Sequence, residues 1–279
     1  MPYTAEISRG NPTCFLFLID QSGSMSDPSP FSPGKSKANA LADAINNLLR
    51  NLSLQCSKEE GVRNYYYIGV IGYGGNGVKF AFEGVLANQP LVPISEIADH
   101  PYRIEEKIKD IEDGAGDIIQ KKVKFPIWFE ASASGGTPMC EAFKKAHSIL
   151  TDWVHQYPNS FPPIVIHLTD GESTDGDPSL SAQHLQELAT NDGNVLIFNA
   201  HISSKPLAPM LFSDNENLLP DQHAKLLFKI SSLLPSHMRE VAEGLGFQVS
   251  EKSKAFVFNA DLVDVIKFLK VGTQPSNLR

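Results

Sequence analysis

The chain has 279 residues, 42% apolar and 20% charged, which is enough core-forming material for one large α/β domain. The formal charge is −8 at pH 7 and the basic residues are scattered, so a basic surface for nucleic acid is not expected. The three cysteines, Cys14, Cys56 and Cys140, are odd in number and far apart, which argues against a disulfide framework and against a zinc site.

Short apolar runs alternate along the first third of the chain with a segment of helical periodicity, as in a sheet with crossover helices. The run 14–19, CFLFLI, is apolar on both faces and predicts a central strand covered on each side. Segment 35–52 repeats apolar residues at spacings of three and four and predicts an amphipathic helix. Segments 65–74 and 78–86 flank a Gly-rich turn and predict two strands of a hairpin.

Segment 103–125 has two charged arms that carry Ile and Val on either side of the turn signal Asp113-Gly114-Ala115-Gly116. We expect a projecting hairpin here, because the turn signal separates two arms of similar length. The spacing of Ile104, Ile108 and Ile111 in the first arm fits a helix equally well, so that alternative stays open.

The second half of the chain repeats the strand and helix alternation. A helix is predicted over 135–154, with Thr137 as its cap and Pro138 at its first position. An apolar strand then ends at Asp170, and Asp177 and Pro178 begin a third helix. The later predicted elements are a strand at 194–202, a helix at 235–245, a strand at 254–260 and a helix at 261–271 capped by Asp261.

No repeat or low-complexity linker divides the chain, so we predict a single domain over residues 1–279. The expected fold class is α/β, doubly wound, with a mostly parallel central sheet and helices on both faces. It includes one antiparallel edge strand and an inserted hairpin at about 100–126, within an insertion of about 87–126.

Three predicted loops bring oxygen-bearing side chains to the carboxyl ends of strands, where open α/β sheets bind ligands. They supply Asp20, Ser22 and Ser24 after the first strand, Thr137 before the second helix, and Asp170 after the strand that ends there. Carboxylates and hydroxyls are hard donors that suit Mg²⁺ or Mn²⁺, and the absence of Cys and His disfavours zinc. The sequence therefore predicts a divalent-metal site at this edge of the sheet.

The D-x-S-x-S alternation predicts that Asp20, Ser22 and Ser24 turn to one side of an extended loop, with Gly23 permitting close approach. Ser26 continues the spacing, but we expect it on the loop beyond the ion.

This pattern resembles the metal-ion-dependent adhesion site of a von Willebrand factor A (vWA) domain. The segments DQSGSM, GGTPM and LTDGE further resemble stand-alone cytosolic bacterial vWA proteins. The resemblance implies that Ser22, Ser24 and Thr137 contact the ion, and that Asp20 and Asp170 do so directly or through water. The ion would be Mg²⁺ or Mn²⁺ in preference to Ca²⁺.

The resemblance also implies a function. It predicts a non-catalytic protein–protein interaction module in which a partner's Asp or Glu fills an open coordination position. Relatives of this kind accompany Ser/Thr kinases, PP2C-type phosphatases or MoxR-like ATPases, so a role in bacterial signalling or complex assembly is expected by analogy. Two parts of the chain depart from a minimal domain of this family and leave the partner open, namely the insertion of about 87–126 and the loop 27–34.

An enzymatic alternative is a metal-dependent phosphoesterase, in which the same cation polarises a phosphoryl oxygen. Ser22 stands where a D-x-D phosphatase needs a second acid, and no nucleophile or base is evident. We therefore predict that the protein is not an enzyme.

Other local patterns have simpler interpretations. A phosphate-binding loop at SPGKS would need a glycine where Ser29 stands, so Lys35 and Lys37 are expected on a solvated helix start. His167, within the strand before Asp170, is expected to be a hydrogen-bonded core residue and not a catalytic base.

The expected location is the cytoplasm. The N-terminal residues MPYTAEISRGNPT lack the features of an export signal, and no apolar run approaches the roughly 18 residues that span a bilayer. No contact with a membrane is predicted.

Overall fold

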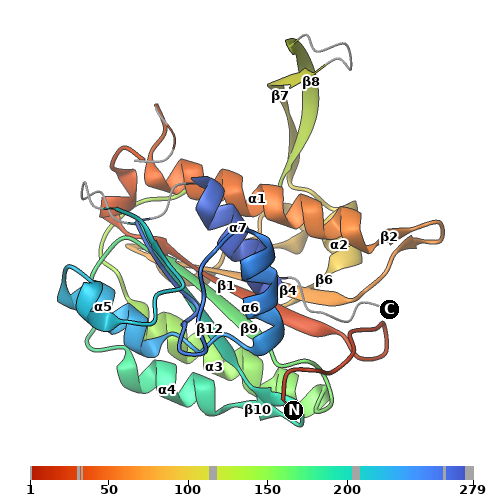
Figure 1. The fold of residues 1–279 in the computed structure, drawn as a ribbon. Coiled ribbons are helices and arrows are strands. Elements are labelled where there is room, and N and C mark those ends of the chain that lie inside the picture. Colours follow the sequence, from red (N-terminus) through yellow and green to blue (C-terminus); the bar gives the residue numbers. More distant parts are fainter. Residues whose placement is uncertain are drawn as a thin grey trace.

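The computed structural model describes residues 2–29, 32, 34–112, 118–202, 208–259 and 262–273. A central sheet has helices on both faces (Figure 1). Its strands are β1 (Thr13–Gln21), β4 (Tyr66–Gly74), β5 (Gly77–Phe80), β6 (Val92–Pro93), β9 (Ile164–Thr169), β12 (Leu196–His201), β13 (Met210–Leu211) and β14 (Phe256–Phe258). The helices are α1 (Lys37–Cys56), α2 (Ile94–Asp99), α3 (Met139–Gln156), α4 (Ser179–Glu187), α5 (Gln222–Ile230), α6 (Ser236–Gly244) and α7 (Leu262–Thr273).

The strand order is β13-β14-β12-β9-β1-β4-β5, and β6 also pairs with β4. The five strands from β14 to β4 run parallel, which confirms the predicted doubly wound α/β class. In place of the one antiparallel edge strand that we predict, the structure has three short ones, β13 at one edge and β5 and β6 beside β4 at the other.

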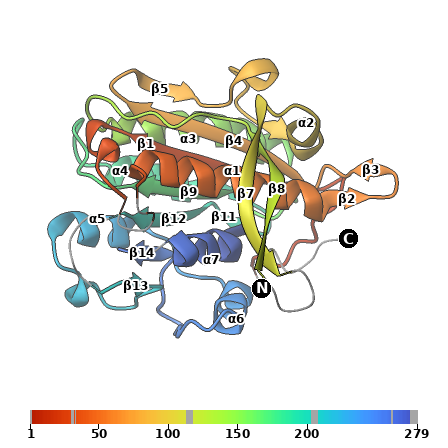
Figure 2. The same ribbon diagram turned by 90° about the horizontal axis from the view of Figure 1, so that it is seen from above.

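Two apolar cores lie on opposite faces of the sheet, and β1 contributes to both by strand alternation. Phe15, Phe17 and Ile19 pack into the core on the side of α1, α2, α6 and α7, while Leu16 and Leu18 pack into the core on the side of α3, α4 and α5. Figure 2 shows α1 and α7 lying across the first of these faces. The all-apolar run of β1 is thus explained by burial on both faces.

Several predicted element boundaries change in the structure. The strand predicted at 78–86 ends at Phe80, and residues Gly84–Leu86 form a short 3₁₀ helix, η2, with Gly84 at a φ of +65°. The strand predicted at 194–202 begins two residues later, at Leu196. Helix α5 is not among the predicted elements, and the predicted cap Asp261 lies outside the described residues.

Segment 103–125 forms the predicted hairpin, and the helical alternative for its first arm is wrong. Strand β7 (Arg103–Glu112) pairs antiparallel with β8 (Ile118–Ile127). In Figure 1 this two-stranded arm stands out from the body on the side of α1. Its turn signal, 113–116, lies outside the described residues. Within the predicted insertion, Ile94 and Ile97 of α2 are buried in the core, so the projecting part begins only at β7.

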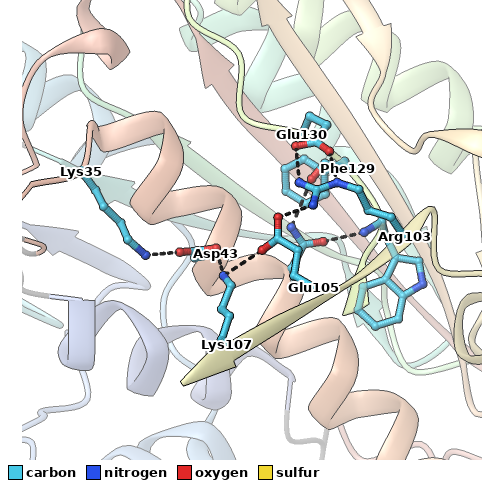
Figure 3. Close-up of polar contacts among 9 residues, drawn as sticks. Lys35, Asp43, Arg103, Glu105, Lys107, Phe129 and Glu130 are labelled. Atoms are coloured by element: carbon cyan, nitrogen blue, oxygen red, sulfur yellow. Dashed lines mark hydrogen bonds and ion pairs between the residues drawn. The ribbon is translucent and has the colours of Figure 1, made fainter. Parts of the chain in front are cut away.

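The arm is held against α1 by ion pairs (Figure 3), and one buried amide of α1 binds the segment that follows the arm. Lys107 binds Asp43 of α1 at 2.7 Å, and Asp43 also pairs with Lys35. The buried Asn46 accepts from the backbone N–H of Trp128 at 2.9 Å and donates to the carbonyl of Phe129 at 3.1 Å. The two hydrogen bonds of Asn46 hold Trp128 and Phe129, at the start of the segment that leads from the arm toward Thr137.

Within the described part of the chain, no helix is both long enough and apolar enough to cross a bilayer.

Candidate functional site

The predicted site residues come together because neighbouring parallel strands end at the same edge of the sheet. Strands β1 and β9 pair side by side up to Ile19 and Leu168. Asp20, the next residue of β1, and Asp170, the first residue after β9, therefore lie close together at the ends of adjacent strands. The loop before α3 reaches the same edge and contributes Thr137. All five predicted residues, Asp20, Ser22, Ser24, Thr137 and Asp170, therefore line one cluster, which we call the oxygen cluster.

Asp20 forms the floor of the oxygen cluster and is only 1% exposed. Its Oδ1 accepts from the backbone N–H of Ser22 at 2.8 Å, and its Oδ2 accepts from the hydroxyl of Thr169 at 2.6 Å. Burial raises the pKa of this carboxyl; the hydrogen bonds from Ser22 and Thr169 oppose that rise, and the nearby Asp170 adds to it. A buried carboxylate in this position would be stabilised by a cation.

The two serines link the aspartates. Ser22 Oγ and Ser24 Oγ lie 3.1 Å apart, and Ser24 Oγ donates to Asp170 Oδ1 at 2.7 Å. The loop is not extended as we predict, because residues Gly23–Ser26 form a 3₁₀ turn, η1, that brings these side chains together. Ser26 donates to the carbonyl of Gly23 at 2.7 Å, in agreement with its expected position outside the cluster.

The geometry around Gly171 tests whether these residues fit a small hard cation. A Cβ built on Gly171 would lie 3.7 Å from Thr137 Oγ1, 3.8 Å from Ser24 Oγ and 3.9 Å from Asp20 Oδ2. Oxygens from two segments far apart in the sequence, the end of β1 with η1 and the loop before α3, thus face one small region beside a glycine that contributes no side chain. Because all of them are hydroxyl or carboxylate oxygens, the donor set fits Mg²⁺ or Mn²⁺.

Glycines allow the loop that carries Thr137 to lie against the neighbouring loops. Gly135 has a φ of +66°, and a Cβ there would lie 2.2 Å from the Cα of Gly75, so only glycine fits. The N–H of Gly23 donates to the carbonyl of Gly135 at 2.9 Å. A Cβ on Gly23 would make an ordinary 3.5 Å contact, so the close approach is at Gly135 and Gly75 and not, as we predict, at Gly23.

The start of α3 differs from the sequence prediction. The helix begins at Met139, and Thr137 does not cap it with its side chain. Asp175 does so instead, because its carboxylate accepts from the N–H groups of Cys140 at 3.0 Å and Glu141 at 2.9 Å. This leaves the hydroxyl of Thr137 free of a capping role, and the N–H of Thr137 donates to Thr174 Oγ1 at 2.8 Å.

Lys37 is the residue at the site that sequence reasoning placed wrongly. Its side chain is 4% exposed, not solvated, and its Nζ lies 2.7 Å from Asp170 Oδ2 and 3.5 Å from Asp27 Oδ2. Lys35 fits the prediction better, with a side chain that is 48% exposed. Thr169, which donates a hydrogen bond to Asp20, is a second residue of the site that the sequence prediction does not include. Its place directly before Asp170 is the signal that could have indicated it.

His167 is the hydrogen-bonded core histidine that we predict. It is fully buried, its Nε2 lies 2.5 Å from Tyr73 Oη, and its Nδ1 lies 2.7 Å from Asn199 Oδ1. Burial lowers the pKa of His167 to about 4. It is therefore neutral at neutral pH.

Among the described residues, no group of three or more His, Cys, Asp and Glu side chains is arranged to hold a metal. An ion in the oxygen cluster would accordingly depend on the hydroxyls as well as on the two aspartates.

No protein-family model matches this chain, and no curated protein sequence does. Similar solved structures include the pilus adhesin RrgA from Streptococcus pneumoniae, which is 16% identical in sequence and has a TM-score of 0.30. The match covers 61% of this chain and 22% of the adhesin. The minor pilin PilB from Streptococcus sanguinis is 10% identical with a TM-score of 0.36, the match covering 70% of this chain and 51% of the pilin.

A third similar structure is the vWF domain of the type V pili tip protein Mfa5 from Porphyromonas gingivalis. It is 11% identical with a TM-score of 0.35, and the match covers 96% of this chain and 98% of that domain. The chain thus spans about a fifth of the adhesin and about half of the minor pilin. At these identities and TM-scores, the likenesses say nothing about what this chain binds.

Proposed function

We propose that this protein is a non-catalytic interaction module that binds an acidic side chain of a partner protein through a divalent cation, Mg²⁺ or Mn²⁺. The observation that carries the proposal is the convergence of oxygens from Asp20, Ser24 and Thr137 on the small region beside Gly171. Ser22 and Asp170 complete the cluster through their hydrogen bonds to Ser24.

The donor set explains why a partner carboxylate would be needed. Only two of the five side chains are anionic, so a divalent cation held here keeps part of its charge unneutralised. When bound, such a cation supplies an electrophilic position that a carboxylate from another protein can fill. Hydrogen bonds fix the loops that carry the hydroxyl groups: Ser24 binds Ser22 and Asp170, and the N–H of Thr137 binds Thr174. The chain therefore supplies its own ligands to the cation in a fixed arrangement, and the partner supplies the remaining one.

The partner classes that we propose follow from the resemblance to stand-alone bacterial vWA proteins. They are Ser/Thr kinases, PP2C-type phosphatases and MoxR-like ATPases, in bacterial signalling or complex assembly in the cytoplasm. The three cysteines are free and buried, which is compatible with a reducing compartment. Nucleic acid is not a proposed partner, because the net charge is −8.

A metal-dependent pull-down tests the proposal. Tagged wild-type protein and Thr137→Ala are incubated with lysate of the native cells in MgCl₂ or in EDTA, with Ser26→Ala as a control on the same loop. We expect proteins that wild type and Ser26→Ala retain only in Mg²⁺ and that Thr137→Ala loses. If wild type and both variants retain the same proteins with and without the metal, the oxygen cluster is not the interface.

A further inference from the structure

Lys37 has a position that its place on α1 does not explain. It is the first residue of the helix, where the positive end of the helix dipole disfavours a cation. Burying an ammonium also costs free energy unless a counter-charge is close. Its side chain nevertheless lies 4% exposed, with Nζ 2.7 Å from a carboxylate oxygen of Asp170. The compensating interaction is therefore with Asp170 and not with the helix.

The two oxygens of Asp170 have different partners. Oδ1 accepts from Ser24 at 2.7 Å and so faces the oxygen cluster. Oδ2 binds Lys37 and faces α1. The Asp170 side chain is fully covered, so water does not screen this pair. Asp27, the second carboxylate near Lys37, lies 3.5 Å away and is 58% exposed, so its contribution is the weaker one.

The charge of the site follows from these contacts. Asp20 and Asp170 are the two carboxylates of the oxygen cluster, and the Lys37 ammonium offsets one of them. The affinity of an oxygen site for a divalent cation rises with the number of anionic ligands that remain uncompensated. The positive charge of Lys37 also repels a cation directly.

We propose that Lys37 is a built-in counter-ion of the oxygen cluster, a positioning residue that holds Asp170 and weakens binding of the metal alone. The site then binds a divalent cation only weakly on its own, and the acidic group of the partner adds the negative charge that strengthens this binding. Metal and partner are thereby made to bind together. This inference rests on the proposed function, because it assumes that the oxygen cluster binds a divalent cation.

The test is a Mn²⁺ titration of purified full-length protein, followed by the electron paramagnetic resonance signal of free Mn²⁺. Wild type is compared with Lys37→Met, and Lys35→Met serves as the matched control. Lys35 lies two residues before Lys37, just outside α1, but is 48% exposed and pairs with Asp43 instead. We expect Lys37→Met to bind Mn²⁺ at least about ten-fold more tightly than wild type, and Lys35→Met to stay within about two-fold.

Loss of a buried partner can also destabilise the fold, so Lys37→Gln, which keeps a hydrogen-bond donor without the charge, is titrated in parallel. For both Lys37 variants, Mn²⁺ should raise the melting temperature more than it does for wild type. Equal or weaker Mn²⁺ binding by folded Lys37→Gln would overturn the inference.

The same Mn²⁺ titration of an Asp20→Ala variant distinguishes a failure of this inference from a failure of the proposed function. If Asp20→Ala abolishes Mn²⁺ binding while the Lys37 variants bind like wild type, the cluster binds metal and only the role of Lys37 is wrong. If Asp20→Ala leaves the binding unchanged, or no variant binds Mn²⁺, the proposed function fails and the inference fails with it.

Discussion

The buried histidine gives a pH dependence of stability that can be worked out from the structure. His167 is enclosed between Tyr73 and Asn199, and burial lowers its pKa from 6.5 to about 4. Below pH 6.5 the unfolded chain takes up a proton at this residue and the folded protein does not. The folded state therefore loses stability as the pH falls from 6.5 toward 4, and His167 contributes no further change above pH 6.5.

The magnitude follows from the two pKa values. A difference of about 2.5 units corresponds to about 3 kcal/mol at 1.36 kcal/mol per unit, of which about 2 kcal/mol is lost between pH 7 and pH 5. The free energy of unfolding would be measured by urea denaturation at pH 7, 6 and 5 for wild type and His167→Gln. Because all other groups titrate in both proteins, the difference between the two curves isolates His167.

We expect the wild-type curve to fall more steeply, so that His167→Gln loses about 2 kcal/mol less between pH 7 and pH 5. His155→Gln, a change at an exposed residue of α3, should follow wild type. Parallel curves for wild type and His167→Gln would refute the assignment of a neutral, buried histidine.

Two further predictions concern the supports of the site. Asn46→Leu removes both hydrogen bonds to Trp128 and Phe129 and should lower the free energy of unfolding by about 2–3 kcal/mol. Urea denaturation measures this loss, with Asn47→Leu on the same helix as the control. Equal losses in the two variants would contradict the role of Asn46. Asp175→Ala removes the cap of α3 and should cost about 1–2 kcal/mol at pH 7. Although burial raises the pKa of Asp175, the N–H groups of Cys140 and Glu141 lower it overall, so this loss should be full above about pH 4 and should shrink as the pH falls from there through the lower pKa of the folded state. A deficit that persists at low pH would speak against the charged cap.

The parts of the site that sequence reasoning found are those that a local pattern specifies. Strand β1 is apolar on both faces and runs directly into Asp20, so its place in the sheet and the position of the acid follow from neighbouring residues. Parallel strands end at one edge, which is why Thr137 and Asp170 could be joined to Asp20 from more than a hundred residues away.

The errors concern contacts that form only in the tertiary structure. A lysine at a helix start is usually solvated, and only the buried carboxylate of Asp170, 133 residues away, turns Lys37 inward. Asp175 caps α3 although it lies 35 residues after Cys140 in the sequence, which no capping pattern next to the helix could indicate. The spacing of Ile104 and Ile108 fits a helix as well as a strand, and the cross-strand pairing with β8 decides it.

The central claim is that the oxygen cluster binds a divalent cation, and equilibrium binding tests it most directly. Isothermal titration of Mg²⁺ and Mn²⁺ into wild type, Asp20→Ala and Ser26→Ala, at pH 7.5, compares a residue at the floor of the cluster with a serine outside it. We predict one cation bound per chain for wild type and Ser26→Ala, and no binding for Asp20→Ala while its circular dichroism spectrum stays that of a folded protein. Binding by Asp20→Ala with the stoichiometry and affinity of wild type would contradict the account.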